Sequence, residues 1–233
     1  MFRFPSQRQQ HVRTLNPYLF KSKFECLTHV ISRNLKSYLV GTENGHIHKC
    51  SCSYNEQYLG TYFSHSGPVN RVKWSPFLTN VFLSCSSDWT VCLWSQDSEE
   101  PILRFQSGRD TVSDVAWSPH ISTCFATVSS DGRLEIWDLQ SSVLDPIINH
   151  NVLDRKFTSV LFSSKSPTIL TGDDNGSITV YKLCKSVLNE DDTSTAGIID
   201  ARASLPSYNE SAAVWRAQQA ATLQQLISGK NSV

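Results

Sequence analysis

Three side chains whose types could form a hydrolytic triad lie close together in this sequence: His65, Ser84 and Asp88. A serine nucleophile, a histidine base and an orienting carboxylate are the parts of that catalytic arrangement. It also needs an oxyanion hole and a strained nucleophile elbow of the Gly-x-Ser-x-Gly type. The sequence offers neither, and no Gly-rich phosphate loop is present. We therefore interpret the three residues as structural, and predict no enzyme activity and no cofactor.

The chain has seven cysteines, and their spacing argues against a metal site. Cys50 and Cys52 stand two apart in a strand pattern, so they point to the same face. A zinc site needs a second pair of ligands, and no Cys-x-x-Cys or His pair supplies one. An odd number of cysteines without a secretion signal indicates free thiols in a reducing compartment.

Composition excludes several classes of partner. Lys plus Arg and Asp plus Glu both number 21, so the net charge is zero and binding to nucleic acid is not expected. No apolar run approaches the roughly 18 residues of a membrane helix, so we expect no membrane partner. The first five residues, Met1 to Pro5, lack the apolar region of a signal peptide, which predicts a cytoplasmic protein.

The positions that could do chemistry belong to an internal repeat. Four tight turns are centred on Asn44, Asp88, Asp131 and Asn175, with steps of 44, 43 and 44 residues. Two further columns keep a fixed distance from these turns. They are Val40, Ser84, Thr127 and Thr171 four residues before, and Cys50, Trp94, Trp137 and Tyr181 six residues after. Three columns locked together over four copies indicate a repeat architecture.

Each copy reads as a small antiparallel sheet. In the second copy, residues 69–74 alternate and end at Ser75-Pro76, residues 81–85 form the next strand, and residues 91–94 return after the turn. Residues 101–105 supply an outer strand. Units of four strands at this period are typical of the blades of a β-propeller, so the fold class is predicted to be all-β.

The residue types in these columns resemble WD repeats. Such repeats join a His, a Ser or Thr, an Asp in the turn and a Trp, and the second copy has all four: His65, Ser84, Asp88 and Trp94. A buried Asp is tolerated only when donors surround it, so the set is predicted to form a hydrogen-bonded tetrad that fixes the blade. The other copies keep part of it, namely Thr127, Asp131 and Trp137 in the third and Thr171, Asn175 and Tyr181 in the fourth.

Longer stretches resemble the dynein intermediate chains, most of all the axonemal branch and, within it, the inner-arm type. The stretches are residues 38–51, residues 81–91 with Trp89 where most WD repeats have Gly, residues 114–119 and residues 170–176. The resemblance implies a non-catalytic subunit that scaffolds a motor heavy chain, with other intermediate and light chains as partners. It also implies a place in the cytoplasm and in the axoneme of a cilium or flagellum.

The chain departs from that family by having four blades where about seven are expected, and by lacking a long light-chain-binding region. We predict blades at about 24–63, 64–106, 107–150 and 151–183, preceded by an unassigned segment, 1–23. A linker at 184–206 and a helical tail at 207–233 follow. The open ends of such a half-propeller would expose strand edges and an uncovered blade face.

Two surfaces are candidates for partner contact. Trp89 lies at a turn tip, and an exposed Trp is typical of a binding hot spot. In the tail, Trp215, Leu223 and Leu226 lie near one face of the predicted helix, which either docks on its own propeller or contacts a partner. An alternative function is a general WD adaptor, such as a substrate receptor of a ubiquitin ligase. Gln140, where such receptors often have Arg, weakens that alternative.

Overall fold

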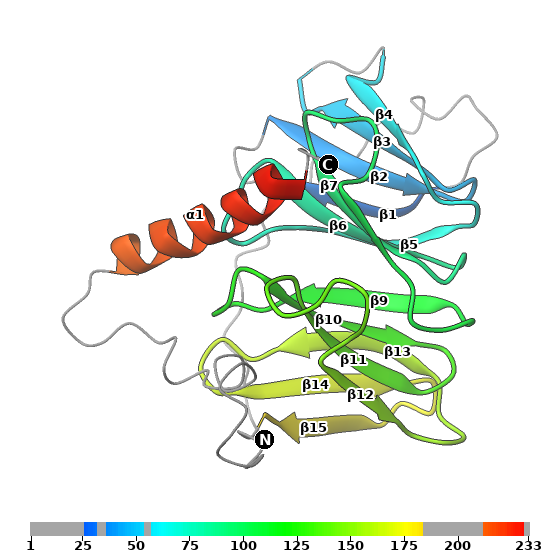
Figure 1. The fold of residues 1–233 in the computed structure, drawn as a ribbon. Coiled ribbons are helices and arrows are strands. Elements are labelled where there is room, and N and C mark those ends of the chain that lie inside the picture. The colour runs from blue at the N-terminus through cyan, green and yellow to red at the C-terminus, as the bar shows by residue number, and fades with distance from the viewer. Residues whose placement is uncertain (1–25, 32–35, 54–56, 184–211, 231–233) are drawn as a thin grey trace, which may run out of the picture.

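The computed structural model describes residues 26–31, 36–53, 57–183 and 212–230. Fifteen strands and one helix make up this part of the chain. The strands form four separate antiparallel sheets, stacked in chain order from β1–β4 to β13–β15 (Figure 1). The predicted all-β architecture of four propeller blades with a C-terminal helix is thus confirmed. The segments 1–23 and 184–206 and the start of the tail lie outside the described residues.

The first two blades are complete four-stranded sheets. The strands of blade one are β1 (Cys26–Ile31), β2 (Ser37–Thr42), β3 (His46–Ser51) and β4 (Gly60–Phe63). Those of blade two are β5 (Val69–Trp74), β6 (Val81–Ser86), β7 (Val91–Ser95) and β8 (Leu103–Phe105). In both, consecutive strands pair, so each blade is a simple meander.

The last two blades differ in their number of strands. The strands of blade three are β9 (Val112–Trp117), β10 (Cys124–Ser129), β11 (Arg133–Asp138) and β12 (Ile148–Asn151). Those of blade four are β13 (Phe157–Phe162), β14 (Thr168–Asp173) and β15 (Ile178–Lys182). Among the described residues, no strand pairs with the outer edge of β15.

Each blade has two apolar faces, and alternation along the strands produces them. The forward face meets the next blade and carries two columns. They are Leu39, Leu83, Ala126 and Leu170 on the second strands, and Ile47, Val91, Leu134 and Ile178 on the third. The backward face meets the preceding blade and carries the aromatic columns. They are Tyr38, Phe82, Phe125 and Ile169, and Cys50, Trp94, Trp137 and Tyr181.

The core forms where the forward face of one blade packs against the backward face of the following blade. Leu39 and Ile47 of blade one pack with Phe82 and Trp94 of blade two in one cluster. A second cluster joins the forward face of blade two to the aromatic side chains of blade three. The third joins blade three to Phe157, Val160 and Ile169 of blade four. The core is therefore a series of interfaces between blades, and it excludes water because most of these side chains are fully buried.

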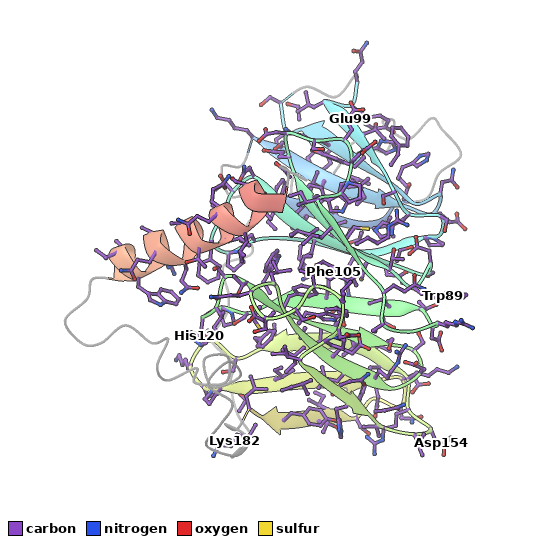
Figure 2. All side chains as sticks on the ribbon, viewed as in Figure 1. Trp89, Glu99, Phe105, His120, Asp154 and Lys182 are labelled. Carbon is purple, nitrogen blue, oxygen red and sulfur yellow. The ribbon has the colours of Figure 1, made fainter. Side chains whose placement is uncertain are left out.

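The helix α1 (Ala212–Lys230) lies at the end of the blades opposite the tight turns. Figure 1 shows it beside blades two and three, whereas Trp89, at the tip of the β6–β7 turn, lies on the other side in Figure 2. Leu223 and Ile227 enter the cluster between blades two and three. No described helix is long and apolar enough to cross a membrane.

Candidate functional site

The four predicted tetrad residues of blade two are in contact. Nε1–H of Trp94 donates to Oγ of Ser84 at 2.8 Å, and Nε2 of His65 lies 2.7 Å from the same oxygen. On the other side of the ring, Nδ1 of His65 lies 3.1 Å from a carboxylate oxygen of Asp88. The chain Trp94–Ser84–His65–Asp88 therefore connects the buried third strand to the turn at the surface.

Asp88 anchors the turn and the preceding loop at once. Its carboxylate accepts hydrogen bonds from the backbone N–H groups of Ser66 (2.9 Å) and Thr90 (3.1 Å), and from the Thr90 hydroxyl (2.6 Å). Burial by itself would raise the pKa of Asp88, but the His65 and Thr90 hydrogen bonds outweigh it and hold that pKa well below its usual range. The carboxylate is therefore charged at neutral pH.

The ring of His65 is held in the protonated form. Burial favours the neutral ring and lowers the pKa of His65, but hydrogen bonding to Asp88 and to the neighbouring Cys92 outweighs it. The net effect raises the pKa to about 9. A protonated imidazole cannot accept the proton of Ser84, and the Ser84 side chain is fully buried. The buried hydroxyl is out of reach of a substrate, and the arrangement in blade two is that of a hydrogen-bonded network that joins strands and turn.

The His65–Asp88 pair makes the stability of the fold depend on pH. The pKa of His65 rises from an ordinary value of 6.5 to about 9, so its stabilising contribution is complete below pH 6.5 and is lost as the pH rises toward 9. Urea unfolding between pH 6 and 9.5 should show the wild type losing stability more steeply than Asp88→Asn, in which the charge pair is absent. Parallel pH profiles for the two proteins would contradict the assignment.

Blade three keeps residues at the tetrad positions, but different side chains connect them. Glu135, a residue that sequence reasoning missed, is buried and accepts a hydrogen bond from the Thr127 hydroxyl at 3.4 Å. Arg133 bridges Glu135 (3.4 Å) and the turn residue Asp131 (2.5 Å). The Nε1 atom of Trp137 has no hydrogen-bond partner among the described residues. An ion-pair network thus replaces the histidine of blade two.

The only signal for this exchange was the sequence Gly108-Arg109-Asp110 in place of the His-containing loop. A Cβ atom on Gly108 would overlap the guanidinium of Arg133, so a larger residue at this loop position would require the Arg133 side chain to shift. The sequence shows the missing His, but it does not show which charged pair substitutes for it.

Blade four has lost the tetrad. Asn175 is exposed, and the buried Thr171 hydroxyl has no partner in the described part of the chain. Tyr181 instead packs edge-on against His150, with ring centroids 5.2 Å apart. The acid that organises this turn is Asp173, which pairs with Arg155 at 3.0 Å and accepts the Ser177 N–H at 2.7 Å. Asp173 lies two residues before the predicted column, at the end of β14.

Polar contacts also link the inner strands of neighbouring blades. Asp114 of β9 is buried, lies 3.3 Å from Arg71 of β5 and accepts the Val160 N–H of β13 at 3.1 Å. In the same region, Asn70 donates to the carbonyl of Val112 at 2.8 Å. These bonds span blades two, three and four, so they fix the blades relative to one another.

The turns of the four blades share a left-handed backbone at one position. Gly45, Gly132 and Gly176 have φ of 84°, 83° and 78°, and Trp89 occupies the same position with φ of 74°. Only glycine adopts this conformation without cost, and another residue is strained by about 1–2 kcal/mol. The indole is nevertheless 43% exposed, on a turn that the Asp88 network holds rigid. Such an outlier at the surface is a candidate contact site.

The propeller region is similar in sequence to a known protein family. Residues 35–183 match the family described as "Dynein axonemal intermediate chain 3 WD40 domain". The chain belongs to this axonemal dynein intermediate chain family. Neither the matches nor the described structure supplies an observation in favour of the ubiquitin-ligase adaptor.

Relatives in the family are similar over the propeller region. Zebrafish (Danio rerio) dynein axonemal intermediate chain 4 is 55% identical over 149 residues, which cover 64% of this chain and 19% of that protein. The human protein of that name is 48% identical over 147 residues, covering 63% and 17%. Bovine (Bos taurus) dynein axonemal intermediate chain 1 is 47% identical over 149 residues, covering 63% and 21%. The chain thus matches about a fifth of the length of these relatives.

A solved structure supports the fold alone. The crystal structure of the computationally designed protein Ika4 aligns with a TM-score of 0.57 at 17% identity. The alignment covers 70% of this chain and 94% of the designed one.

In this dynein-family chain, the tail residues predicted to contact a partner face the propeller. Leu223 is fully buried and Leu226 is partly buried against the same core cluster. The ring of Trp215 packs edge-on against Phe77, with centroids 5.8 Å apart. Gln219, which interrupts the apolar face, accepts the Ser122 N–H at 2.9 Å. Leu223 is therefore a packing residue in this structure, because its side chain is out of reach of any partner.

Cys52, Cys85, Cys92 and Cys124 are free thiols, and all of these except Cys52 are buried. Among the described residues, no group of three or more His, Cys, Asp or Glu side chains could hold a metal ion.

Proposed function

We propose that the chain is a non-catalytic subunit of an axonemal dynein motor complex, in which its propeller holds a motor heavy chain. Other intermediate chains and light chains are the further partners proposed, and the cytoplasm and the axoneme of a cilium or flagellum are its proposed locations. Membership of the axonemal intermediate chain family is the observation that carries this proposal.

The described structure supports a binding role through its rigidity. A partner surface gains affinity when its contact residues are already ordered, because less conformational entropy is lost on binding. Asp88 fixes the turn that carries Trp89 through bonds to Ser66 and Thr90, and the tetrad connects that turn to the buried core. Loops on such a scaffold are where binding residues concentrate. We therefore place the heavy-chain contact on the face of the tight turns, with Trp89 at its centre.

The test is a pull-down from an extract of ciliated cells with the tagged 233-residue chain, read by mass spectrometry. Recovery of an axonemal dynein heavy chain would support the proposal. Recovery of chaperones alone would mean that this chain does not carry the motor contact.

Trp89→Gly should reduce heavy-chain recovery about tenfold or more, as expected for a hot-spot aromatic residue. The melting temperature should stay the same or rise, because glycine adopts the left-handed backbone at position 89 without strain. A quantitative pull-down and a thermal melt measure the two effects.

Leu144→Ala is the matched control. Leu144 is 80% exposed and follows the far end of β11, away from the tight turns. It should retain full recovery. Equal recovery with Trp89→Gly, or an equal loss with Leu144→Ala, would rule out a specific contact at Trp89.

A further inference from the structure

An apolar pocket opens between blades three and four, at the end of the blades opposite the tight turns. One of its lining residues, His120, lies on the same side of the molecule as α1, whereas Trp89 lies on the other side (Figure 2). The pocket is therefore separate from the face of the tight turns, where the heavy-chain contact is proposed. Its apolar lining includes Ile121, Ile136, Ile148, Phe162 and Leu183.

The repeat relates this pocket to the groove that α1 fills between blades two and three. The same strand pairs and the same loop hydrogen bonds position the lining residues at both places, so each residue of one groove has a counterpart in the other. The counterparts are Leu78 and Ile121, Leu93 and Ile136, Leu103 and Ile148, and Leu139 and Leu183.

The helix α1 shows what such a groove accepts. Leu223 and Ile227 lie in one cluster with Leu93 and Leu139, and their side chains are 0% and 6% exposed. Residues four apart project from the same face of a helix, so α1 inserts both side chains into the groove together. A groove of this shape and composition therefore fits an amphipathic helix.

Blade one shows that an apolar groove at this end is not a general feature of the blades. Between blades one and two, Lys49 pairs with Gly60 where Leu93 pairs with Leu103 in blade two. Gln96 takes the position of Leu139, because its N–H makes the equivalent bond to the preceding loop. The aliphatic side chains between blades three and four are thus particular to that junction.

The pocket is also less covered than the groove beneath α1. Phe162 and Leu183 are half-buried, whereas their counterparts Trp117 and Leu139, which contact the α1 cluster, are 9% and 5% exposed. A helix seated between blades three and four would remove the remaining apolar surface from water, which favours its binding.

We propose that the pocket between blades three and four binds an amphipathic helix of a partner protein, which inserts two aliphatic side chains four residues apart. This helix lies beside blades three and four in the way that α1 lies beside blades two and three. The proposal does not rest on the heavy-chain contact at Trp89, since the two surfaces are at opposite ends of the blades.

A synthetic peptide with the sequence of α1, residues 212–230, is the probe, because it carries the required aliphatic pair. Fluorescence anisotropy of the labelled peptide, titrated with the purified 233-residue chain, should show saturable one-to-one binding. A peptide with Leu223→Asp and Ile227→Asp should bind at least about tenfold more weakly, and a peptide with Gln225→Ala should bind unchanged. An unmodified peptide that fails to bind would overturn the proposal.

Variants of the chain locate the bound peptide. Ile148→Lys places a charge in the apolar pocket and should weaken binding at least about tenfold. Gly60→Lys is the matched control, because position 60 is the counterpart of 148 in blade one and a Cβ atom there meets open space. It should bind the peptide as the wild type does, and circular dichroism checks that both variants fold. Binding that survives Ile148→Lys would place the peptide in the α1 groove and would overturn the proposal.

Sedimentation velocity without peptide tests whether a second copy of the chain is the occupant. The wild type should sediment as a monomer of 26.2 kDa. A dimer that Ile148→Lys dissociates would show that another copy fills the pocket, and a partner protein as occupant would be wrong. Trp89→Gly should leave the peptide affinity unchanged, so failure at this pocket and failure of the heavy-chain contact are separate results.

Discussion

Asp88→Ala should lower the free energy of unfolding by about 3 kcal/mol, because removing one partner of a buried charged pair leaves the other uncompensated. The Asp88 side chain is only 6% exposed and that of His65 is 0% exposed. The substitution leaves the protonated His65 ring without its carboxylate and removes the acceptor of the Ser66 and Thr90 N–H groups. Urea unfolding monitored by tryptophan fluorescence and circular dichroism measures the loss.

The repeat itself supplies the matched control for this prediction. Asn175 occupies the Asp88 column in blade four but is exposed, so Asn175→Ala should change stability by no more than about 0.5 kcal/mol. Asp88→Asn should fall between the two, since the amide oxygen can still accept hydrogen bonds but carries no charge for His65. Equal effects at positions 88 and 175 would show that the column, rather than the buried network, determines stability.

The repeat made the fold predictable because the same physical requirement recurs in each blade. A period of 43 or 44 residues placed the turns, and the aromatic residues Trp94, Trp137 and Tyr181 marked the third strands. All three lie on backward faces, where packing against the preceding blade requires an apolar surface. Trp89 could also be singled out, because its column otherwise holds glycine with positive φ.

The polar networks were less predictable, since a column fixes the place of a residue but not its partners. Blade two joins its columns through His65, blade three through Glu135 and Arg133, and blade four through Asp173 and Arg155. In each blade, the turn at the end of the second strand must be hydrogen-bonded, and the three blades achieve this with different side chains. The surface on which the helical tail packs could not be predicted either, because the apolar face of an amphipathic helix can pack on its own propeller or on a partner.

Leu223→Ala should destabilise the docked helix by about 3 kcal/mol, as expected for a large-to-small change in a packed core. Leu223 is 0% exposed and belongs to the cluster that contains Leu83 and Leu93 of blade two and Leu139, which follows β11 of blade three. The loss has two possible forms, a lower melting temperature of the whole chain or undocking of α1 alone. Hydrogen exchange separates them, because undocking would remove the protection of amides 212–230 while leaving the strands protected.

Gln225→Ala is the matched control, since Gln225 lies on the same helix and is exposed. Alanine favours the helix slightly more than glutamine does, so stability and exchange protection should be unchanged or slightly higher. If Leu223→Ala behaved like Gln225→Ala, the helix would not be held by this core contact in solution. A selective loss with Leu223→Ala would establish α1 as part of the propeller core, bridging blades two and three, and would leave the turn face around Trp89 as the surface available to the motor.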